Sequence, residues 1–338
     1  MYRNYTTILE YLWLDGIGIR RSKTRIVNSN ILKVDDIPIW NCDGSSTGQA
    51  ESNGNTEVIL VPIKYFLNPL IESNDVKSNS YIVLCETFDI NMVPLPSNHR
   101  AKAVKIFNKG LDEEPWFGIE QEYIMIHKNY KTASQGLEGR HYCGTQLNGI
   151  ERTIAEEHLT ACLKANIKYA GLNSEVTISQ WEYQVGPCEG IEAADHLTVA
   201  NFLLERIAEK HNIIISYHPK LYIDKNGTGC HTNFSTARMR WEDGIEEIHR
   251  CMEKLKYNHT KHIEVYGEGN DNRLTGTHET SSYTQFSFGV GTRNTSVRIP
   301  SQVEKDGCGY FEDRRPAANC DPYQVTSIIF QTCCLEEI

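Results

Sequence analysis

Two glutamates stand two residues apart inside an otherwise apolar run, Phe117-Gly118-Ile119-Glu120-Gln121-Glu122-Tyr123. The run has the composition of a β-strand, and side chains at positions i and i+2 of a strand point to the same face. Two carboxylates in one interior repel each other and lose hydration, so they must share a proton or bind a cation. The pair therefore predicts either a shared proton or a metal site.

Other acidic residues and one histidine lie in comparable apolar or aromatic surroundings: Glu175, Glu182, His231 and Glu312. A predicted turn separates Glu175 from Glu182, so a hairpin would bring the two carboxylates together. His231 shares a predicted strand face with Asn233 and Ser235. Taken singly, a strand glutamate is more often a solvated edge residue, and a histidine is more often a core residue than a ligand. Together, five glutamates and one histidine favour Mg²⁺ or Mn²⁺ over zinc.

Arginines supply the opposite charge. The candidates are Arg273, Arg293, Arg298, Arg314 and Arg315. Arginine binds phosphate and carboxylate groups through two parallel hydrogen bonds, and metal carboxylates combined with arginines are typical of phosphoryl transfer. The alternative is ordinary surface charge. The chain contains neither a GxxxxGK[ST] run nor a GxGxxG fingerprint, so a nucleotide would have to bind in another way.

Composition excludes several classes of protein. The chain has 338 residues, 40% of them hydrophobic, which is enough for a large core and for two domains. A net charge of -10 argues against a nucleic-acid partner. No apolar run approaches the ~18 residues of a membrane helix, and the N-terminus lacks the order of a signal peptide, so we expect no membrane partner and a cytoplasmic location. The eleven cysteines include no CxxC pair and are expected to be reduced thiols.

The elements that must position these residues fall into two parts. Short apolar runs separated by turn residues predict a small β-rich unit, which ends at Val93-Pro94-Leu95-Pro96, a segment unable to form a central strand. We place domains at residues 1–95 and 96–338. The second has three helical stripes: Ala155, Leu159, Cys162 and Leu163; Leu197, Ala200, Leu204, Ile207 and Ala208; Ile245, Ile248, Met252 and Leu255. Strands and helices of this kind predict an α+β protein.

The motifs taken together resemble glutamine synthetase of the eukaryotic type, along nearly the whole chain. The matching segments follow in the order of that family: WNCDGSSTGQA (40–50), PWFGIEQEY (115–123), NSEVTISQWEYQVGPCEGI (173–191), NGTGCHTNFST (226–236), NRLTGTHET (272–280), TRNTSVRIP (292–300) and GYFEDRRPAANCDPY (309–323). By composition alone the first of them would be an ordinary turn. The resemblance implies a small β-grasp-like N-terminal domain and a larger catalytic α/β domain whose curved antiparallel sheet lines the active site.

The resemblance also implies roles for individual residues. Glu122, Glu175 and Glu182 match the ligands of the ion nearest glutamate, and Glu120, His231 and Glu312 match those of the ion on the ATP phosphates. The nucleotide-binding matches are Trp116, Glu182, Gln184, Pro187, Asn233, Ser235, Arg293 and Arg298. The glutamate-binding matches are Asn226, Gly227, Arg273, Arg293 and Arg314. The ammonium-binding matches are Asp43, Ser46, Tyr142 and Glu279.

The resemblance implies that glutamate, ammonium and ATP are the substrates, with two or three Mg²⁺ or Mn²⁺ ions. ATP would phosphorylate the γ-carboxylate of glutamate, with Arg314 beside the transferring phosphate, because an oxide is a poor leaving group. Asp43 would accept a proton from ammonium to free ammonia for attack, and Glu279 would shield the intermediate from water. A homo-oligomeric ring, two stacked pentamers, is expected, because Asp43 would complete the site of a neighbouring subunit.

Some segments depart from the pattern of the family, namely the loop at residues 144–150 and the Asp224-Lys225 pair before Asn226. They leave three alternatives open. The chain could be an inactive protein that keeps the scaffold for a structural or binding role, or a γ-glutamyl ligase for another amine or acid. Paired carboxylates also occur in metal-dependent hydrolases, but that reading leaves the arginines and the Asp43 segment unexplained.

Overall fold

The computed structural model describes residues 6–51, 53–71, 78–127, 139–147 and 149–336, which form two compact units. The first unit comprises residues 1–102 with the segments 160–167 and 198–203, and the second comprises the rest. The predicted division at residues 95 and 96 stays a prediction. In the part of the chain that the structure describes, none of the helices is long and apolar enough to cross a membrane.

The first unit contains a five-stranded sheet with the order β2-β1-β5-β4-β3. Its strands are β1 (Thr6–Leu14), β2 (Arg20–Val27), β3 (Trp40–Asp43), β4 (Glu57–Leu67) and β5 (Ser78–Phe88). β1 pairs with β5 in parallel, whereas the other neighbours are antiparallel. Short 3-10 helices lie before and after β3, at Val34–Asp36 and Gly44–Thr47. The predicted β-rich unit is thus confirmed.

The core of the first unit forms mainly from residues of β1, β4 and β5, and partly buried residues of β2 and β3 pack against it. The buried members are Leu9, Tyr11, Trp13, Ile31, Ile37, Val58, Leu60, Val83 and Cys85. Tyr11 packs edge-on against Trp40 with the ring centroids 5.2 Å apart, and its hydroxyl donates to the carbonyl of Pro38. Burial of this apolar surface holds β3 in the sheet, and β3 ends at Asp43.

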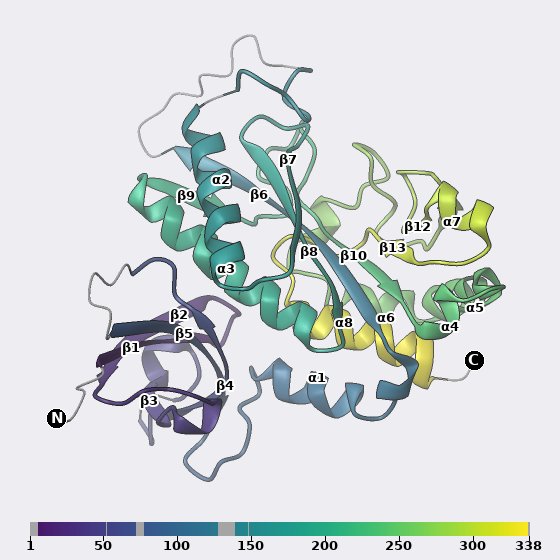
Figure 1. The fold of residues 1–338 in the computed structure, drawn as a ribbon. Helices are drawn as coiled ribbons and strands as arrows, with labels where there is room; N and C mark the ends of the chain where they lie inside the picture. Colours follow the sequence, from purple (N-terminus) through teal and green to yellow (C-terminus); the bar gives the residue numbers. More distant parts are fainter. Residues whose placement is uncertain (1–5, 52, 72–77, 128–138, 148, 337–338) are drawn as a thin grey trace. The chain divides into compact units, whose positions relative to one another are not determined.

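The second unit is a mixed α/β fold around an eight-stranded sheet, mostly antiparallel, with the order β11-β12-β13-β10-β6-β8-β7 and β9 paired to β6 (Figure 1). Its strands are β6 (Trp116–His127), β7 (Tyr169–Ser174), β8 (Gln180–Glu189), β9 (Ile213–Ser216), β10 (Cys230–Ser235), β11 (Phe288–Val290), β12 (Val297–Ile299) and β13 (Phe311–Asp313). The strand predicted over residues 117–123 is therefore confirmed, as part of β6.

Helices alternate with these strands along the chain. They are α1 (His99–Phe107), α2 (Gly149–Lys164), α3 (Glu192–Lys210), α4 (Ala237–Arg240), α5 (Gly244–Tyr257), α6 (His259–Ile263), α7 (Ser301–Asp306) and α8 (Pro322–Phe330), with short 3-10 helices at Leu111–Glu113 and Asn270–Asn272 and a π-helix at Gln331–Leu335. The stripe predicted for α3 is confirmed. In α5 it is confirmed for Ile248, Met252 and Leu255, whereas Ile245 is only half-buried. In α2 the prediction is wrong for Leu163, which is exposed; His158 is buried instead, against the rings of Tyr169 and Tyr183.

An aromatic core underlies the strands that carry the site. The rings of Phe117, Phe234 and Phe311 come from β6, β10 and β13 and pack against one another, with centroids 5.0 Å and 5.6 Å apart in successive pairs. Phe107 and Phe330 continue the cluster from α1 and α8. Because successive side chains of a strand alternate in direction, burial of Phe234 and Phe311 places their neighbours Asn233 and Glu312 on the opposite face.

Candidate active site

Strand register places the carboxylates of β6 beside polar residues of its two neighbours. Glu120 lies opposite His231 of β10, and Glu122 lies opposite Glu182 of β8. Between them Gln121 points the other way and donates to the carbonyl of Ala318. Directly opposed side chains in a sheet are near enough to interact strongly. The sheet therefore gathers the two predicted carboxylates with partners that are distant in the sequence.

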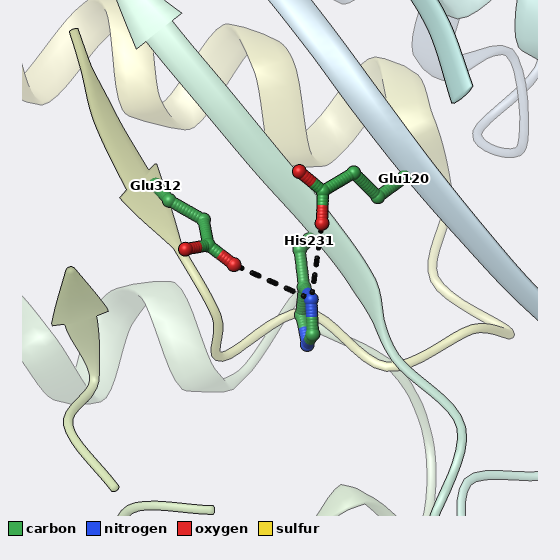
Figure 2. A group of neighbouring side chains, drawn as sticks. All are labelled: Glu120, His231 and Glu312. Carbon is green, nitrogen blue, oxygen red and sulfur yellow. Dashed lines mark ion pairs between the residues drawn. The ribbon is translucent and has the colours of Figure 1, made fainter. Parts of the chain in front are cut away.

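Glu120, His231 and Glu312 form what we call the acidic triad (Figure 2). Nδ1 of His231 lies 3.5 Å from Glu120 Oε2 and 3.5 Å from Glu312 Oε1. One ligand atom from each residue lies within 4.8 Å of the other two. Two carboxylates and one imidazole form a suitable donor set for a hard divalent cation.

Glu122, Glu175 and Glu182 form a second group of carboxylates. The antiparallel β7 and β8 pair as the predicted hairpin, with Glu175 in the turn between them. Burial raises the pKa of Glu182 to about 9, with further contributions from the neighbouring carboxylates. Burial and the charge of Glu175 raise the pKa of Glu122 to about 8. Such crowding favours either protons or cations at these oxygens, so this group too fits divalent metal.

Two arginines pair with Glu312 of the acidic triad, and a third pairs with Glu279. Nη1 of Arg314 lies 2.6 Å from Glu312 Oε1, and Nη1 of Arg298 lies 3.6 Å from Glu312 Oε2. Arg293 forms an ion pair with Glu279, with Nη1 3.2 Å from Oε1. Arg298 is partly exposed, so its guanidinium is accessible to an anionic ligand. These groups can neutralise charge on phosphate or carboxylate oxygens.

Both groups line a single cavity of the second unit. The lining residues are Glu120, Glu122, Tyr142, Asn173, Glu175, Glu182, His231, Asn233, Glu279, Arg293, Arg298, Pro300, Tyr310, Glu312 and Arg314. The cavity wall is therefore dominated by charged and polar groups of both signs. Such a wall can bind an anionic substrate together with cations.

The cavity includes three residues that the sequence reasoning missed: Asn173, Pro300 and Tyr310. Asn173 and Tyr310 each stand two positions before a predicted glutamate, Glu175 and Glu312, and the same spacing rule could have found them. Asn173 donates to Glu175 through its amide at 2.9 Å. No comparable signal marks Pro300.

Several predicted residues lie outside the cavity lining. Trp116 begins β6 and pairs in register with Ser235, and the guanidinium of Arg240 stacks on its ring at 3.9 Å. Arg240 also donates to Ser235 Oγ at 3.0 Å. The three residues form a separate aromatic and cationic group at the ends of β6 and β10. Arg240 was not predicted, because it has no motif spacing to Trp116.

Four further predicted residues also lie outside the cavity lining: Gln184, Pro187, Asn226 and Gly227. Gln184 donates to Asn173 at 3.1 Å, and Pro187 is exposed at the end of β8. The carbonyls of Asn226 and Gly227 accept from Thr177 and Gln180. A Cβ at Gly227 would lie 2.4 Å from the carbonyl oxygen of Pro219, so only glycine fits there.

Asp43 and Ser46 belong to the first unit, where both are exposed. Asp43 accepts from the backbone N–H of Ser45 at 3.0 Å and from its hydroxyl at 2.7 Å. The hydroxyl and backbone N–H groups of Ser45 lower the pKa of the Asp43 carboxyl. Asp43 is thus an exposed, ionised carboxylate at the start of a 3-10 helix.

A buried polar network holds the far side of β13. Asp313 and Arg315 alternate with Glu312 and Arg314, and Arg315 donates to Asp313 through Nε at 2.9 Å and Nη2 at 2.7 Å. The Tyr266 hydroxyl donates to the same carboxylate at 2.7 Å. Since this network is fully buried, it fixes the strand that presents Glu312 to the cavity.

Comparison with known proteins gives a family model and several similar sequences. Residues 98–260 match the family model described as glutamine synthetase, catalytic domain. A putative glutamine synthetase of Acanthamoeba polyphaga mimivirus is 50% identical, with 97% of this chain and 94% of that protein covered. The glutamine synthetase of Emericella nidulans is 46% identical over 97% of this chain and 93% of its own length. A cytosolic isozyme of glutamine synthetase from Pinus sylvestris is also 46% identical, over 96% and 93%.

Among solved structures, a cryo-electron microscopy structure of Plasmodium falciparum glutamine synthetase has a TM-score of 0.76 to this chain at 16% identity. The matched region covers 96% of this chain and 71% of the Plasmodium falciparum chain. At this identity the likeness concerns the fold alone, a mixed α/β fold with curled sheets.

Proposed function

The chain belongs to the glutamine synthetase family, and on that premise we propose how its residues perform the ATP-dependent synthesis of glutamine from glutamate and ammonia. The observation that carries the proposal is the gathering of six glutamates, one histidine and three arginines around one cavity. That combination suits a phosphoryl transfer to a carboxylate, in which the protein mainly positions anions and neutralises their charge. The enzyme is a glutamate–ammonia ligase.

We assign two or three divalent ions, Mg²⁺ or Mn²⁺, to the cavity. The acidic triad would hold an ion at the nucleotide side, and Glu122, Glu175 and Glu182 would hold ions at the glutamate side. Support comes from the donor set of the triad and from the raised pKa values of Glu122 and Glu182. When bound, such ions neutralise negative charge on phosphate and carboxylate oxygens.

ATP is assigned to the edge of the cavity formed by β10, β12 and β13. Asn233 and Arg298 line the cavity there, and Glu182 and Arg293 line it from other segments. The group of Trp116, Ser235 and Arg240 supplies an aromatic surface and a cation, the chemistry that suits a nucleotide base or ribose. Gln184 and Pro187 complete the proposed nucleotide-binding set.

Glutamate is assigned to Asn226, Gly227, Arg273, Arg293 and Arg314. The γ-carboxylate attacks the terminal phosphorus of ATP, the bond to ADP breaks, and γ-glutamyl phosphate forms. Arg314 carries a positive charge at the cavity wall, where it would neutralise the phosphate during transfer. Glu279, Arg293 and Tyr142 line the same cavity and would cover the acyl phosphate.

Ammonium is assigned to Asp43, Ser46, Tyr142 and Glu279. Ammonium has no lone pair, so a carboxylate must accept one of its protons before the nitrogen can attack the acyl carbon. Asp43 is ionised and exposed, as this step requires. Attack then expels phosphate and yields glutamine.

We further propose a homo-oligomeric ring, two stacked pentamers, in which Asp43 of one subunit serves the catalytic unit of its neighbour. The exposure of Asp43 in the first unit supports this assignment. We also propose that the first unit is β-grasp-like, on the basis of its parallel β1 and β5 flanked by antiparallel strands, and that the protein is cytoplasmic, as is the cytosolic isozyme of Pinus sylvestris.

One assay tests the proposed function. Purified protein is given ATP, Mg²⁺ and glutamate, and phosphate release is measured with and without ammonium. The expected result is release that depends on both glutamate and ammonium, with one glutamine formed per phosphate. Release that is independent of ammonium, or no release at all, would overturn the proposal.

A further inference from the structure

A buried cluster behind the cavity contains two histidines and one glutamate with no part in the roles assigned above. Glu151, in the first turn of α2, accepts from the Ser179 hydroxyl at 2.7 Å and from Trp181 Nε1 at 3.4 Å, and its Oε1 lies 2.8 Å from His127 Nε2. His141 is only 1% exposed, and its Nε2 lies 3.9 Å from Glu151 Oε2. Its ring packs edge-on against Trp181.

Two hydrogen bonds of the His141 ring define which of its nitrogens donates. The backbone N–H of Ser179 points at Nε2 at 3.3 Å, so Nε2 must offer a lone pair. The proton is therefore on Nδ1, which donates to the carbonyl oxygen of Glu175 at 2.6 Å. One ring thus connects the two ends of the turn that runs from Glu175 to Ser179.

The backbone of the same residue is tied to the other side of Glu175. The carbonyl of His141 accepts from the Ser174 hydroxyl at 2.7 Å, and the N–H of Cys143 donates to the carbonyl of Ser174 at 3.0 Å. Tyr142 lies between these two anchored residues. Hydrogen bonds from both sides of Glu175 therefore hold the short segment that carries Tyr142.

We propose that His141 is a positioning residue that sets the placement of Tyr142 relative to Glu175 at the cavity wall. Tyr142 and Glu175 both line the cavity, whereas the buried ring of His141 does not. The inference rests on the proposed function, in which Tyr142 belongs to the ammonium site. Its role is to keep the amine-accepting end of the cavity in the geometry that captures ammonium.

Removal of the ring leaves the carbonyl of Glu175 and the N–H of Ser179 without their partner and releases the Tyr142 segment on one side. Most of the residues assigned to ATP lie on β6, β8, β10 and β12, and within the described residues none of them has a hydrogen bond or ion pair with His141. Replacement of His141 should therefore raise the KM for ammonium more than the KM for ATP. One lost buried hydrogen bond corresponds to a change of about fivefold to tenfold in an affinity.

The test compares H141L with H141Q in the full-length enzyme. Leucine has a similar bulk but no polar atoms, so KM for ammonium should rise about tenfold while KM for ATP changes less than about twofold. Glutamine has one amide donor and one carbonyl acceptor, which can replace Nδ1 and Nε2, and H141Q should recover most of the ammonium KM. H211L serves as the matched control, because His211 pairs with Glu157 outside the cavity lining.

The outcomes separate this inference from the function on which it rests. If the unaltered enzyme releases no ammonium-dependent phosphate, the proposed function fails, whatever the variants do. If it is active and H141L keeps its ammonium KM, the positioning role is refuted. If the KM values for all three substrates rise equally and H141Q does not recover them, His141 has a purely structural role. That result also refutes the positioning role. Should H141L not fold, H141N replaces it, because its amide reaches Glu175 but not Ser179, and an intermediate ammonium KM is then expected.

Discussion

Nη2 of Arg273 lies 3.1 Å from Nε2 of His231. A guanidinium can only donate, so Nε2 accepts and the proton of the neutral imidazole is on Nδ1, the atom that faces the two carboxylates of the acidic triad. Burial lowers the pKa of His231 well below its ordinary value, which keeps the ring neutral. Arg273 is buried as well and also donates to the carbonyls of Arg314 and Arg315.

A cation held by the acidic triad needs the lone pair of Nδ1, so the proton of His231 must move to Nε2, where it opposes the Arg273 contact. We expect Mg²⁺ to switch His231 from the Nδ1–H to the Nε2–H tautomer. Nitrogen-15 spectra of histidine-labelled protein measure this directly. His262 is an internal control, since its two ring nitrogens contact Tyr266 and Thr332, and its signals should stay unchanged. An unaltered His231 tautomer at saturating Mg²⁺ would contradict the assignment.

E122Q should lower glutamine formation by about 100-fold or more, because it removes a charge proposed to hold the glutamate-side ion. The fold should not suffer. The pKa of Glu122 is raised to about 8 by burial and by Glu175, so the neutral amide relieves repulsion, and the metal-free Tm at pH 8 should equal or exceed that of the unaltered protein. E304Q, an exposed change in α7, is the control for both measurements. Full activity in E122Q would show that the metal assignment is wrong.

The metal-free protein should lose stability as the pH rises from 7 to 8. Glu122 and Glu182 have folded-state pKa values of about 8 and about 9, far above the ordinary value of 4.5, so the folded state binds more protons than the unfolded state in this window. The free energy of unfolding therefore falls with rising pH. Histidines in the unfolded chain are already largely neutral there. Saturating Mg²⁺ should flatten the slope, and urea unfolding at both pH values with and without the ion measures it. A slope that Mg²⁺ leaves unchanged would refute the explanation.

Y266F removes the hydroxyl that donates to buried Asp313 and contacts His262. We expect a loss of about 1–3 kcal/mol in the free energy of unfolding, because buried partners are left unsatisfied. Since the network positions β13, we also expect Mn²⁺ to bind about tenfold more weakly, as measured by calorimetry without turnover. Y257F is the matched control, because Tyr257 is exposed at the end of α5. Lower stability with unchanged Mn²⁺ affinity would show that the network around Asp313 does not affect metal binding.

D43N and E122Q should each be nearly inactive alone, yet partly active after they are mixed, dissociated and reassembled. In the proposed ring, some sites then receive an intact Asp43 from one subunit and an intact Glu122 from its neighbour. At most about a quarter of the sites can be restored by random assembly of equal amounts, as expected for two independent partners. Recovery near that fraction supports a shared site. No recovery, with oligomers intact by light scattering, would place both residues of a working site in one chain.

Local spacing was enough to predict those parts of the site that lie on one strand or one hairpin. The i, i+2 pair of Glu120 and Glu122 needed only the alternation of a strand, and the turn between Glu175 and Glu182 needed only turn chemistry. The amphipathic stripes of α3 and α5 were predictable for the same reason. In α2 the rule failed at Leu163, which is exposed, whereas His158 is buried against the rings of Tyr169 and Tyr183.

The sequence by itself therefore determined which chemistry this protein carries and which residue types supply it. Only the tertiary structure decided which of these residues meet. The register of β6 against β10 brings Glu120 to His231, and the antiparallel pairing of β10 with β13 adds Glu312. The cluster of His141 with Glu151, and the stacking of Arg240 on Trp116, have no periodic signal. Sequence periodicity describes neighbours along one element, whereas contacts between elements depend on packing and register across the whole sheet.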